Sequence, residues 1–417
     1  MQNVQKQSIY QMVFFISFEQ SKTENDTAHT KSKMNISDII INLIPTLWLP
    51  FAWYSRALQK NSIDISELDP STPNQWPFIS IVVAACNEGE TIELGLKSLL
   101  SIDYPNLEII VVNDRSTDNT KEVIAQFTDS RLRVIHIETL PKGWLGKVHA
   151  LHIGTQHTSG EWVLYTDADV QFSPNTVKKT ISMCLEKNID HLTLLPRMYS
   201  DSFWAQSCIS ITLCFIAISQ KPWLVSNPNR KEAVGTGAFN LVRKEAFLKT
   251  LGFEWLKMEV ADDIGLGLMM KESGAISHFY TAFEDVQVEW YPSLSSVVHG
   301  LEKNAYSQIA RFSLLRGLLF STAAATLGLV PFLATLGSLA SLNIIFCFLI
   351  AIYTANQIYP ISKISKLTLS LSFIVGNLLL FYIGLRSTIL GTIRGGVIWR
   401  GTVYPNEELR KGMRVIF

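Results

Sequence analysis

Short apolar runs alternate with amphipathic segments between residues 78 and 166, and this alternation predicts strands that alternate with helices. The strands are expected at 78–85, 107–113, 131–137 and 161–166, from the runs FISIVVAA, LEIIVVN, RLRVIHI and EWVLYT. Helices are expected between them, at 90–101, within 114–127 and at 147–156. Such an order favours parallel strands joined by right-handed crossovers, which gives an open, doubly wound α/β sheet.

A second pattern consists of long apolar stretches with few or no charges. Residues 317–362 contain no Asp, Glu, Lys or Arg, which leaves room for two membrane crossings at about 20 residues each. A break is expected at 336–341, and a third candidate span follows at 367–385. The stretch 39–54 is apolar too, but it is short and contains two prolines, so a kinked or interfacial anchor is an alternative to a full crossing.

These two patterns divide the chain into five parts. Residues 57–316 have the pattern of polar and apolar residues that is typical of an α/β domain. The other parts are an extension at 1–35, an anchor at 36–56, membrane helices at 317–390 and a basic tail at 391–417. The extension is expected either to be disordered or to be non-native, with translation starting at Met34. The apolar stretch 207–219 is expected to form either a buried helix or an interfacial helix.

Composition narrows the class of protein further. The 417 residues include 36 basic and 36 acidic side chains, a balance that argues against a nucleic-acid-binding surface. Apolar residues make up 47% of the chain, which is high for a wholly soluble protein and favours membrane segments. The five cysteines lie in apolar surroundings without the spacing of metal ligands, which is typical of a reducing compartment.

Acidic side chains follow three of the four predicted strands. Asp167 and Asp169 come where the fourth strand ends, and because they are two residues apart they should project to the same side. Glu88 and Asp114 follow the first and second strands. The carboxyl ends of parallel strands form the ligand-binding edge of such a sheet. Neighbouring carboxylates repel one another, so this edge predicts a site for a cation or ribose hydroxyls, the alternative being a set of solvated turns.

Four motifs at this edge resemble a known family. They are AACNEGE, VVNDRSTDNT, GKVHALHIG and YTDADV, and in this order they resemble the nucleotide-sugar-binding half of family 2 glycosyltransferases, whose fold is termed GT-A. The stretch LPKGWLGKVHAL and the C-terminal apolar segments are most similar to the membrane-bound bacterial branch that contains hopene-associated and carotenoid-acid (diaponeurosporenoate-type) glycosyltransferases. The resemblance covers roughly 76–404 and implies a Rossmann-like GT-A domain with transmembrane or interfacial helices.

The resemblance assigns a nucleotide diphosphate sugar to the first half of this domain. It implies that Glu88 and Asp114 contact the base or the ribose, and that Asp167 faces the ribose or the metal. Asp169 would hold Mg²⁺ or Mn²⁺ on the diphosphate, because such hard ions take their remaining ligands from phosphate and water. Lys147 would add a positive charge near the diphosphate, and the alternative is an ordinary lysine at a helix start.

The second half would carry the acceptor and the base. Gly237, in VGTGAFNLVRKEAF, allows the backbone to approach a ligand closely, and the family places the sugar and acceptor beside this segment. Asp262 and Asp263 precede a helix expected at 264–271, and the resemblance makes Asp263 the general base. The family has Glu where this chain has Asp262, so the role of that position is open. The alternative is that both acids simply favour a helix N-terminus.

A motif typical of the family, QxxRW, precedes the C-terminal spans. This chain has Gln308, Arg311 and Phe312 there, with Phe in place of Trp. The arginine would grip the diphosphate, and the aromatic ring would stack on the sugar or the acceptor. The alternatives are a juxtamembrane anchor and a rival alignment with EKNAY at 302–306.

The expected function is that of an inverting glycosyltransferase. Asp263 would take the proton from an acceptor hydroxyl as it attacks the anomeric carbon of a nucleotide sugar, with a UDP-sugar as the expected donor. The expected partners are this donor, a lipid or isoprenoid acceptor and the membrane, and no nucleic acid. A carboxylic acid acceptor is already ionised near neutral pH, so Asp263 would matter less for it.

The catalytic domain is expected in the cytosol, where nucleotide sugars are made, on a multi-pass protein of the inner (plasma) membrane. The basic tail should also be cytosolic, so one C-terminal segment is expected to be interfacial or re-entrant. A processive polysaccharide synthase is the nearer alternative, although it needs more spans to build a sugar channel. A catalytically silent, nucleotide-binding membrane scaffold is the more distant alternative, and acids at every expected position argue against it.

Overall fold

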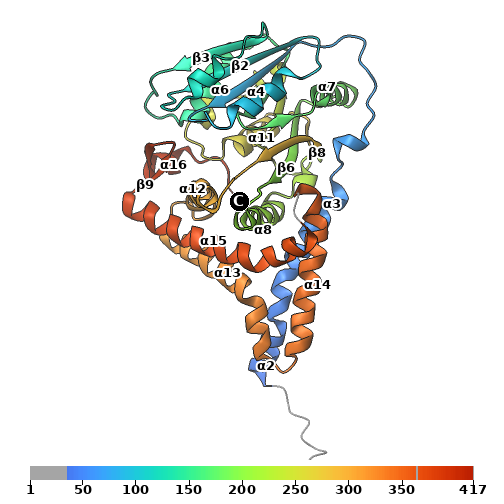
Figure 1. Cartoon of the computed structure of the whole chain (residues 1–417), viewed down its shortest axis with the longest axis vertical. Coiled ribbons are helices and arrows are strands. Elements are labelled where there is room, and N and C mark those ends of the chain that lie inside the picture. The colour runs from blue at the N-terminus through green and yellow to red at the C-terminus, as the bar shows by residue number, and fades with distance from the viewer. Residues whose placement is uncertain (1–34, 363–364, 417) are drawn as a thin grey trace, which may run out of the picture.

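The structure is a computed structural model that describes residues 35–362 and 365–416. A sheet flanked by helices lies at one end of the molecule, and a stalk of long helices lies at the other (Figure 1). The extension expected at 1–35 falls, apart from Asn35, outside the described residues.

The first half of the sheet is built as the apolar runs predict. Strands β1 (Ile79–Ala85), β2 (Leu107–Asp114), β3 (Leu132–Ile137) and β4 (Trp162–Asp167) pair in parallel, in the order β3-β2-β1-β4. The connecting helices are α4 (Ile92–Leu100), α5 (Thr120–Ile124) and α6 (Gly146–Gln156). Helix α5 is shorter than the range predicted for it, because Gln126 and Phe127 turn back and bond to residues three positions earlier.

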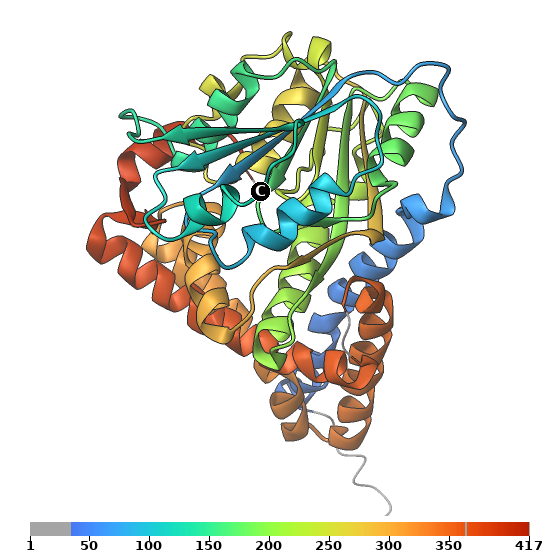
Figure 2. The same ribbon diagram turned by 45° about the horizontal axis from the view of Figure 1, so that its top comes forward.

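The second half of the sheet departs from the parallel arrangement. Strands β5 (Gln171–Phe172), β6 (His191–Tyr199), β7 (Asn240–Arg243) and β8 (Ser277–Glu289) complete the order β3-β2-β1-β4-β7-β6-β8-β5, and the strands lie side by side in Figure 2. Strand β7 runs antiparallel to both β4 and β6. The predicted Rossmann-like α/β fold is therefore confirmed, with a mixed sheet. The remaining helices of this domain are α7 (Thr176–Glu186), α9 (Lys244–Phe247), α10 (Phe253–Leu256), α11 (Asp262–Glu272) and α12 (Leu294–Asn304).

Helix α6 packs closely on the sheet because Gly154 has no side chain. A Cβ atom at this position would lie 2.4 Å from Cγ1 of Val82 and 3.1 Å from Cγ2 of Val112. Val148, nearer the start of the helix, is fully buried against the same face. This close packing fixes the N-terminus of α6 at the carboxyl edge of the parallel strands.

Five helical segments of the described chain are long and apolar enough to cross a membrane. They are α2–η1–α3 (Ile36–Leu43, Ile44–Trp48 and Leu49–Asn61), α8 (Phe203–Gln220, extended by a short turn), α13 (Leu314–Leu333), α14 (Ala340–Ile358) and α15 (Lys366–Arg394). The predicted break falls between α13 and α14. Helices α2, α3 and α14 run along the stalk, whereas α15 lies across the long axis beside α13 (Figure 1).

The apolar stretch 207–219 forms most of α8, which is a buried rather than an interfacial helix. In its most apolar window 61% of the residues are buried, compared with 17% in the window of Ile36–Asn61. Helix α15 approaches it closely, since a Cβ atom at Gly376 would lie 2.4 Å from the carbonyl oxygen of Ser207. The Ser207 hydroxyl also donates a hydrogen bond to Oγ of Ser372, at 3.0 Å.

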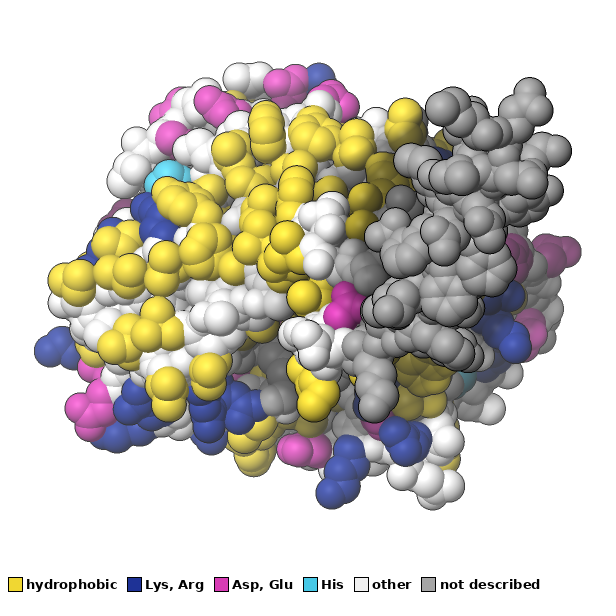
Figure 3. Space-filling model, turned by 90° about the horizontal axis from the view of Figure 1, so that it is seen from below, with side chains coloured by type: hydrophobic (Ala, Val, Ile, Leu, Met, Phe, Trp, Pro, Cys, Tyr) yellow, Lys and Arg dark blue, Asp and Glu magenta, His cyan; other side chains and the backbone are white. Residues whose placement is uncertain are grey.

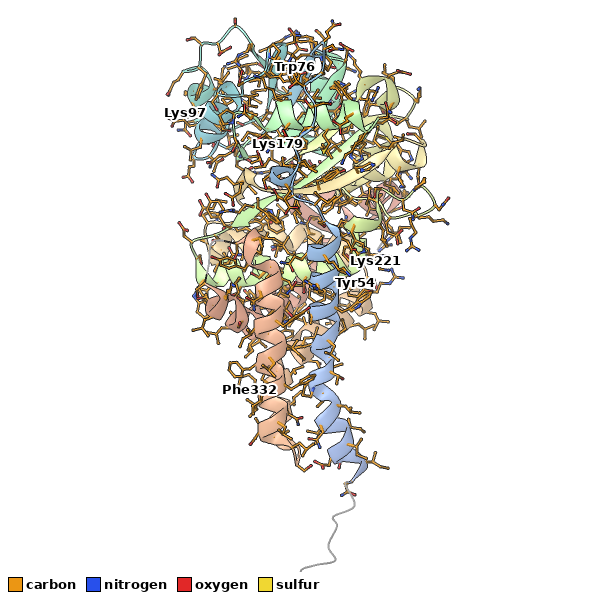
Figure 4. All side chains as sticks on the ribbon, turned by 90° about the vertical axis from the view of Figure 1, so that its right-hand side faces the viewer. Tyr54, Trp76, Lys97, Lys179, Lys221 and Phe332 are labelled. Carbon is orange, nitrogen blue, oxygen red and sulfur yellow. The ribbon has the colours of Figure 1, made fainter. Side chains whose placement is uncertain are left out.

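The stalk exposes many large hydrophobic side chains, including Ile40, Leu43 and Phe332. Seen from the stalk end, hydrophobic side chains form a broad field with Lys and Arg side chains at its edge (Figure 3). In side view Phe332 lies on the stalk, whereas Tyr54 and Lys221 lie where the stalk meets the rest of the molecule (Figure 4). Apolar side chains bordered by aromatic and cationic ones are typical of a membrane-embedded surface.

Polar contacts join α2 to the turn between α13 and α14 at the tip of the stalk. The Asp38 carboxylate accepts a hydrogen bond from the backbone N–H of Ser338 at 2.7 Å. The Asn42 side-chain oxygen accepts one from Nδ2 of Asn343 at 2.8 Å. Hydrogen bonds therefore join α2 to α14 and to the turn before it, in addition to apolar packing.

The basic tail returns to the α/β domain. It forms the hairpin β9 (Gly396–Trp399) and β10 (Thr402–Pro405), followed by α16 (Asn406–Gly412). Val397, Tyr404 and Leu409 are buried in the same hydrophobic cluster as Val148 of α6. The end of the described chain therefore lies beside the α/β domain and away from the stalk tip (Figures 1 and 2).

Candidate active site

An acidic edge forms where the sequence predicts it, at the carboxyl end of β4. Asp167 is the last residue of β4, and its backbone N–H donates to the carbonyl oxygen of Gly237 at 2.9 Å. The ammonium of Lys147, in the first turn of α6, lies 2.6 Å from Oδ1 of Asp167 and 3.4 Å from Oδ2 of Asp262. One lysine thus bridges acids from the two halves of the domain, and its expected role near a diphosphate stays a prediction.

Two glycines before β7 make this close approach possible. A Cβ atom at Gly237 would lie 2.3 Å from Oδ2 of Asp167 and 3.2 Å from the Lys147 ammonium. A Cβ atom at Gly235 would lie 1.7 Å from the carbonyl oxygen of Asp263. The segment therefore brings the end of β4 and the start of α11 together, and larger residues at either position would separate them.

The predicted base lies in the first turn of α11, which begins at Asp262 instead of the expected residue 264. The helix starts earlier because both acids suit its N-terminus, and Oδ1 of Asp263 accepts a hydrogen bond from the N–H of Ile264 at 2.8 Å. Burial, together with the neighbouring charge of Asp262, raises the pKa of Asp263 to about 6. Such a carboxylate is mostly ionised at neutral pH and still basic enough to accept a proton.

Asp169 has the surroundings of a cation ligand. Burial and the nearby charges of Asp167 and Glu88 raise its pKa to about 7. Its carboxylate therefore lacks sufficient positive charge around it, and a hard divalent ion would supply that charge. Within the described residues there is no group of three or more His, Cys, Asp or Glu side chains arranged to hold a metal. An ion here would thus take most of its ligands from a bound diphosphate and from water.

The loops after β1 and β2 form a connected platform beside these acids. The N–H of Glu88 donates to Oγ1 of Thr120 at 2.8 Å, and the N–H of Thr117 donates to Oδ1 of Asn87 at 2.7 Å. Asn87 and Arg115 both adopt left-handed backbone angles, with φ values of 54° and 53°. This conformation is unfavourable for Arg115, whereas asparagine adopts it readily, and strained left-handed residues are frequent at functional sites.

Each predicted nucleotide-binding acid on this platform is engaged by an arginine. Asp114 is buried, and its two oxygens accept hydrogen bonds from Nε and Nη2 of Arg115, both at 2.8 Å. Glu88 forms an ion pair with Arg400 of the C-terminal hairpin. Neither acid lines the large cavity beside Asp167.

This cavity has a volume of about 670 Å³ and leads from the acidic edge toward the membrane helices. At its polar end it is lined by Lys147, Asp167, Asp169, Gly237, Asp262 and Asp263. Further along, the lining comes from α8, α13 and α15, with Ile216, Ala217, Phe320, Leu380 and Ile383. The four acids that line the cavity therefore open onto a space whose other end is mostly apolar.

The QxxRW-like residues are divided between the cavity and the core. Gln308 and Arg311 line the cavity, and Nε2 of Gln308 donates to Oε1 of Glu259 at 3.2 Å. Phe312 is buried in the core, with its ring centroid 5.6 Å from that of Tyr306, and does not line the cavity. Its left-handed backbone, with a φ of 56°, turns the side chain into this cluster.

Lys303 was not among the predicted site residues, although it belongs to the rival motif EKNAY. It lines the cavity, and burial lowers its pKa to about 8, against the opposing effect of Asp262. The motif EKNAY was the signal that could have identified it. Arg400 was also missed, because it lies in a tail that the sequence marks only as basic.

Comparison with known proteins gives a family match over this region. Residues 80–251 match the family model for glycosyl transferase family 2. The poly-β-1,6-N-acetyl-D-glucosamine synthase of Staphylococcus epidermidis is 35% identical over 123 residues, which are 29% of this chain and 29% of that protein. The Escherichia coli protein WfgD, a UDP-Glc:α-D-GlcNAc-diphosphoundecaprenol β-1,3-glucosyltransferase, is 32% identical over 28% of this chain and 44% of its own.

A longer match is to the β-monoglucosyldiacylglycerol synthase of Nostoc, which is 26% identical over 46% of this chain and 40% of that protein. The matches to these relatives thus span less than half of their lengths. Among solved structures, the mannosyltransferase PcManGT of Pyrobaculum calidifontis, in complex with GDP-Man and Mn²⁺, is 16% identical with a TM-score of 0.47, over 85% of this chain and 99% of that chain. The family match thus covers residues 80–251, which are less than half of the chain.

Proposed function

We propose that the protein is an inverting glycosyltransferase that moves a sugar from a nucleotide diphosphate sugar to a lipid or isoprenoid acceptor. The observation that carries this proposal is the cavity of about 670 Å³, which has acids and a lysine at one end and apolar helices at the other. An amphiphile fits such a space, with its hydroxyl near Asp263 and its chain among α8, α13 and α15.

Asp263 acts as the base in this proposal. It accepts the proton of the acceptor hydroxyl while the oxygen attacks the anomeric carbon and the diphosphate leaves, a contribution of about 10²- to 10⁴-fold. Asp262, whose oxygen lies 3.4 Å from the Lys147 ammonium, positions this lysine. Lys147, Lys303 and Arg311 supply positive charge around the cavity for the departing diphosphate.

A divalent ion, Mg²⁺ or Mn²⁺, held by Asp169 with Asp167 beside it, would neutralise charge on the diphosphate. The raised pKa of Asp169 supports this assignment, since its carboxylate has too little positive charge nearby. Glu88 and Asp114 are proposed to bind the base or ribose from the adjoining loops. Gly237, Gln308 and Arg311 are proposed to border the sugar and diphosphate. Phe312 acts only through the packing of this segment.

The donor is proposed to be a UDP-sugar, as in the name of the Escherichia coli relative. A lipid acceptor agrees with the name of the Nostoc relative and with the likeness to the membrane-bound bacterial branch seen in the sequence. Residues 57–316 would be the cytosolic catalytic domain, held at the inner (plasma) membrane by 36–56, whose helix continues to Asn61, and by 317–390. The tail at 391–417 would be cytosolic, because α13 and α14 lead down and back up the stalk and α15 lies across it.

A processive polysaccharide synthase is less well supported than lipid glycosylation. The first relative named above is a polysaccharide synthase, but the cavity here ends among apolar side chains, which suit a growing sugar chain poorly. A silent nucleotide-binding scaffold would not need a partly buried base beside a lysine that bridges two acids.

The proposal is tested with detergent-purified protein and a panel of UDP- and GDP-sugars, each with Mn²⁺, Mg²⁺ or EDTA. Metal-dependent binding and turnover of one donor, lost in Asp169→Asn, is the expected result. That donor, radiolabelled, is then offered with bacterial lipid extract, and label should appear in the lipid phase. If folded protein binds no donor with any metal, the proposal is wrong.

A further inference from the structure

The C-terminal hairpin β9–β10 contacts both loops of the platform after β1 and β2. Arg400, at its tip, forms an ion pair with Glu88, and its Nη1 donates to the carbonyl oxygen of Asn87 at 3.4 Å. Thr402, two residues later, accepts a hydrogen bond from Nη1 of Arg115 at 3.5 Å. These are the loops to which the proposed function assigns the nucleotide.

The same hairpin also contacts the start of α6 and the wall of the cavity. The hydroxyl of Tyr404 accepts a hydrogen bond from the N–H of Gly146 at 3.2 Å, one residue before Lys147. The ammonium of Lys303 lies 3.5 Å from the centre of the Trp399 ring. The hairpin therefore touches the donor loops, the lysine helix and the cavity wall at once.

The turn of the hairpin fixes the direction of Arg400. Arg400 and Gly401 have φ values of 47° and 78°, the left-handed pair that tight two-residue hairpins use. Such a backbone is unfavourable for arginine, whereas asparagine, aspartate or glycine adopt it readily. Arg400 nevertheless adopts this backbone, and its guanidinium contacts a largely buried carboxylate, with 17% of the Glu88 side chain exposed.

We propose that the hairpin β9–β10 is a wall of the nucleotide-sugar site and that Arg400 is a positioning residue, which orients Glu88 toward the donor. This inference rests on the proposed function. The Arg400 guanidinium on Oε1 and the Thr91 hydroxyl on Oε2 restrict the rotation of the Glu88 carboxylate, and its remaining lone pairs can accept hydrogen bonds from a ribose or base. The chain after the membrane helices is then part of the donor site.

The test measures the affinity of the detergent-purified full chain for UDP and GDP, each with Mg²⁺, by titration calorimetry. Arg400→Ala should weaken binding of the preferred nucleotide about tenfold, as expected for loss of one charge-assisted contact. Arg400→Lys keeps the positive charge but lacks the planar guanidinium with its several N–H donors, so this variant should bind the nucleotide with intermediate affinity. Lys411→Ala removes a positive charge from the same tail, where Lys411 forms an exposed pair with Glu407 on α16, and should bind like the wild type.

A double-mutant cycle separates positioning from direct contact. If Arg400 acts through Glu88, then Glu88→Gln and Glu88→Gln/Arg400→Ala should bind nucleotide equally weakly. Additive losses would mean that Arg400 contacts the nucleotide itself, and the positioning role would be wrong. In turnover assays, Arg400→Ala should raise the donor KM while kcat and the lipid KM stay unchanged.

The possible failures are distinguishable. If the wild type binds neither nucleotide, the proposed function fails. If the wild type binds and Arg400→Ala binds as tightly, only this inference fails. If the Arg400→Ala variant unfolds, the folded Arg400→Lys variant is measured in its place. A wild-type nucleotide affinity of Arg400→Lys would then overturn the inference.

Discussion

The ammonium nitrogen of Lys147 lies 2.6 Å from Oδ1 of Asp167, so an ion pair joins the first turn of α6 to the end of β4. Burial disfavours the charge of Lys147, but the carboxylates of Asp167 and Asp262 outweigh this effect and raise its pKa. Lys147 therefore stays protonated throughout the physiological range. A fixed positive charge lies where the proposed diphosphate gains negative charge.

Replacing Lys147 by Met should lower kcat about 10²-fold, the usual cost of removing one preorganised charge from a transition state. Steady-state turnover with saturating donor and metal measures this effect. Lys97→Met is the control, because Lys97 forms an exposed pair with Glu93 on α4 and does not line the cavity. If the Lys147→Met and Lys97→Met variants have the same kcat, Lys147 has a structural role and does not stabilise the transition state.

Turnover should depend on pH through Asp263. Its folded pKa is raised to about 6, and only the ionised carboxylate accepts a proton. Activity should therefore be full above the pKa and fall as the pH drops through about 6. A profile of the turnover rate from about pH 5 to pH 8, at saturating metal, measures this loss of activity on the acidic side.

The acceptor decides how far Asp263→Asn reduces the rate. With an alcohol acceptor the turnover rate should fall about 10²- to 10⁴-fold. The remaining activity should no longer decrease as the pH drops through about 6. With a carboxylic acid acceptor the loss should be small, because that acceptor is already ionised near neutral pH. An alcohol acceptor used at the wild-type rate by Asp263→Asn would remove Asp263 from the mechanism.

Gly237→Ala should weaken metal-dependent donor binding about tenfold, because overpacking of this kind costs about 1–3 kcal/mol. The added Cβ would lie 2.3 Å from Oδ2 of Asp167 and displace that carboxylate. Gly274→Ala is the matched control: Gly274 has a φ of +85° and open space around it, so alanine there strains the backbone without touching the site. Calorimetry and thermal unfolding of both variants distinguish the two effects, and equal donor affinities would contradict the prediction.

Ala217→Trp should prevent binding of the lipid acceptor without affecting binding of the nucleotide-sugar donor. Ala217 of α8 lines the cavity, so an indole there takes volume that the lipid chain would occupy. Transfer to lipid should fall about tenfold or more, while donor binding and slow donor hydrolysis by water persist. Leu371→Trp is the control, since Leu371 is 44% exposed on the outer side of α15. Equal lipid transfer by the two variants would exclude this cavity as the acceptor site.

The parallel half of the fold could be predicted from the sequence because its signals are local. Buried parallel strands need continuous apolar runs, and the polar residues that end them lie at one edge by topology alone. Asp167 and Asp169 were identified in this way, and Lys147 was correctly placed at the start of α6. The proposed roles of Asp262 and Asp263 came from the resemblance, and these roles stay predictions.

The rest depends on contacts between distant segments. Arg400 and Glu88 are 312 positions apart, and nothing local to either residue reveals their pairing. The runs VIW and TVY around Arg400 and Gly401 were a hairpin signal that the basic character of the tail obscured. Strand β7, with four residues, is too short to stand out. Phe312 was expected at the ligand, but its left-handed backbone directs it into the core.

The bond between Asp38 and Ser338 has a consequence for biosynthesis. The two residues are 300 positions apart, so the ribosome needs about 15 to 60 s after Asp38 to make its partner Ser338, at ~5–20 residues per second. During that time α2 has none of its native partners at the stalk tip, and the α/β domain is synthesised before the stalk can close. The anchor at 36–56 thus emerges long before its partners at the stalk tip and is among the last segments to reach its native packing.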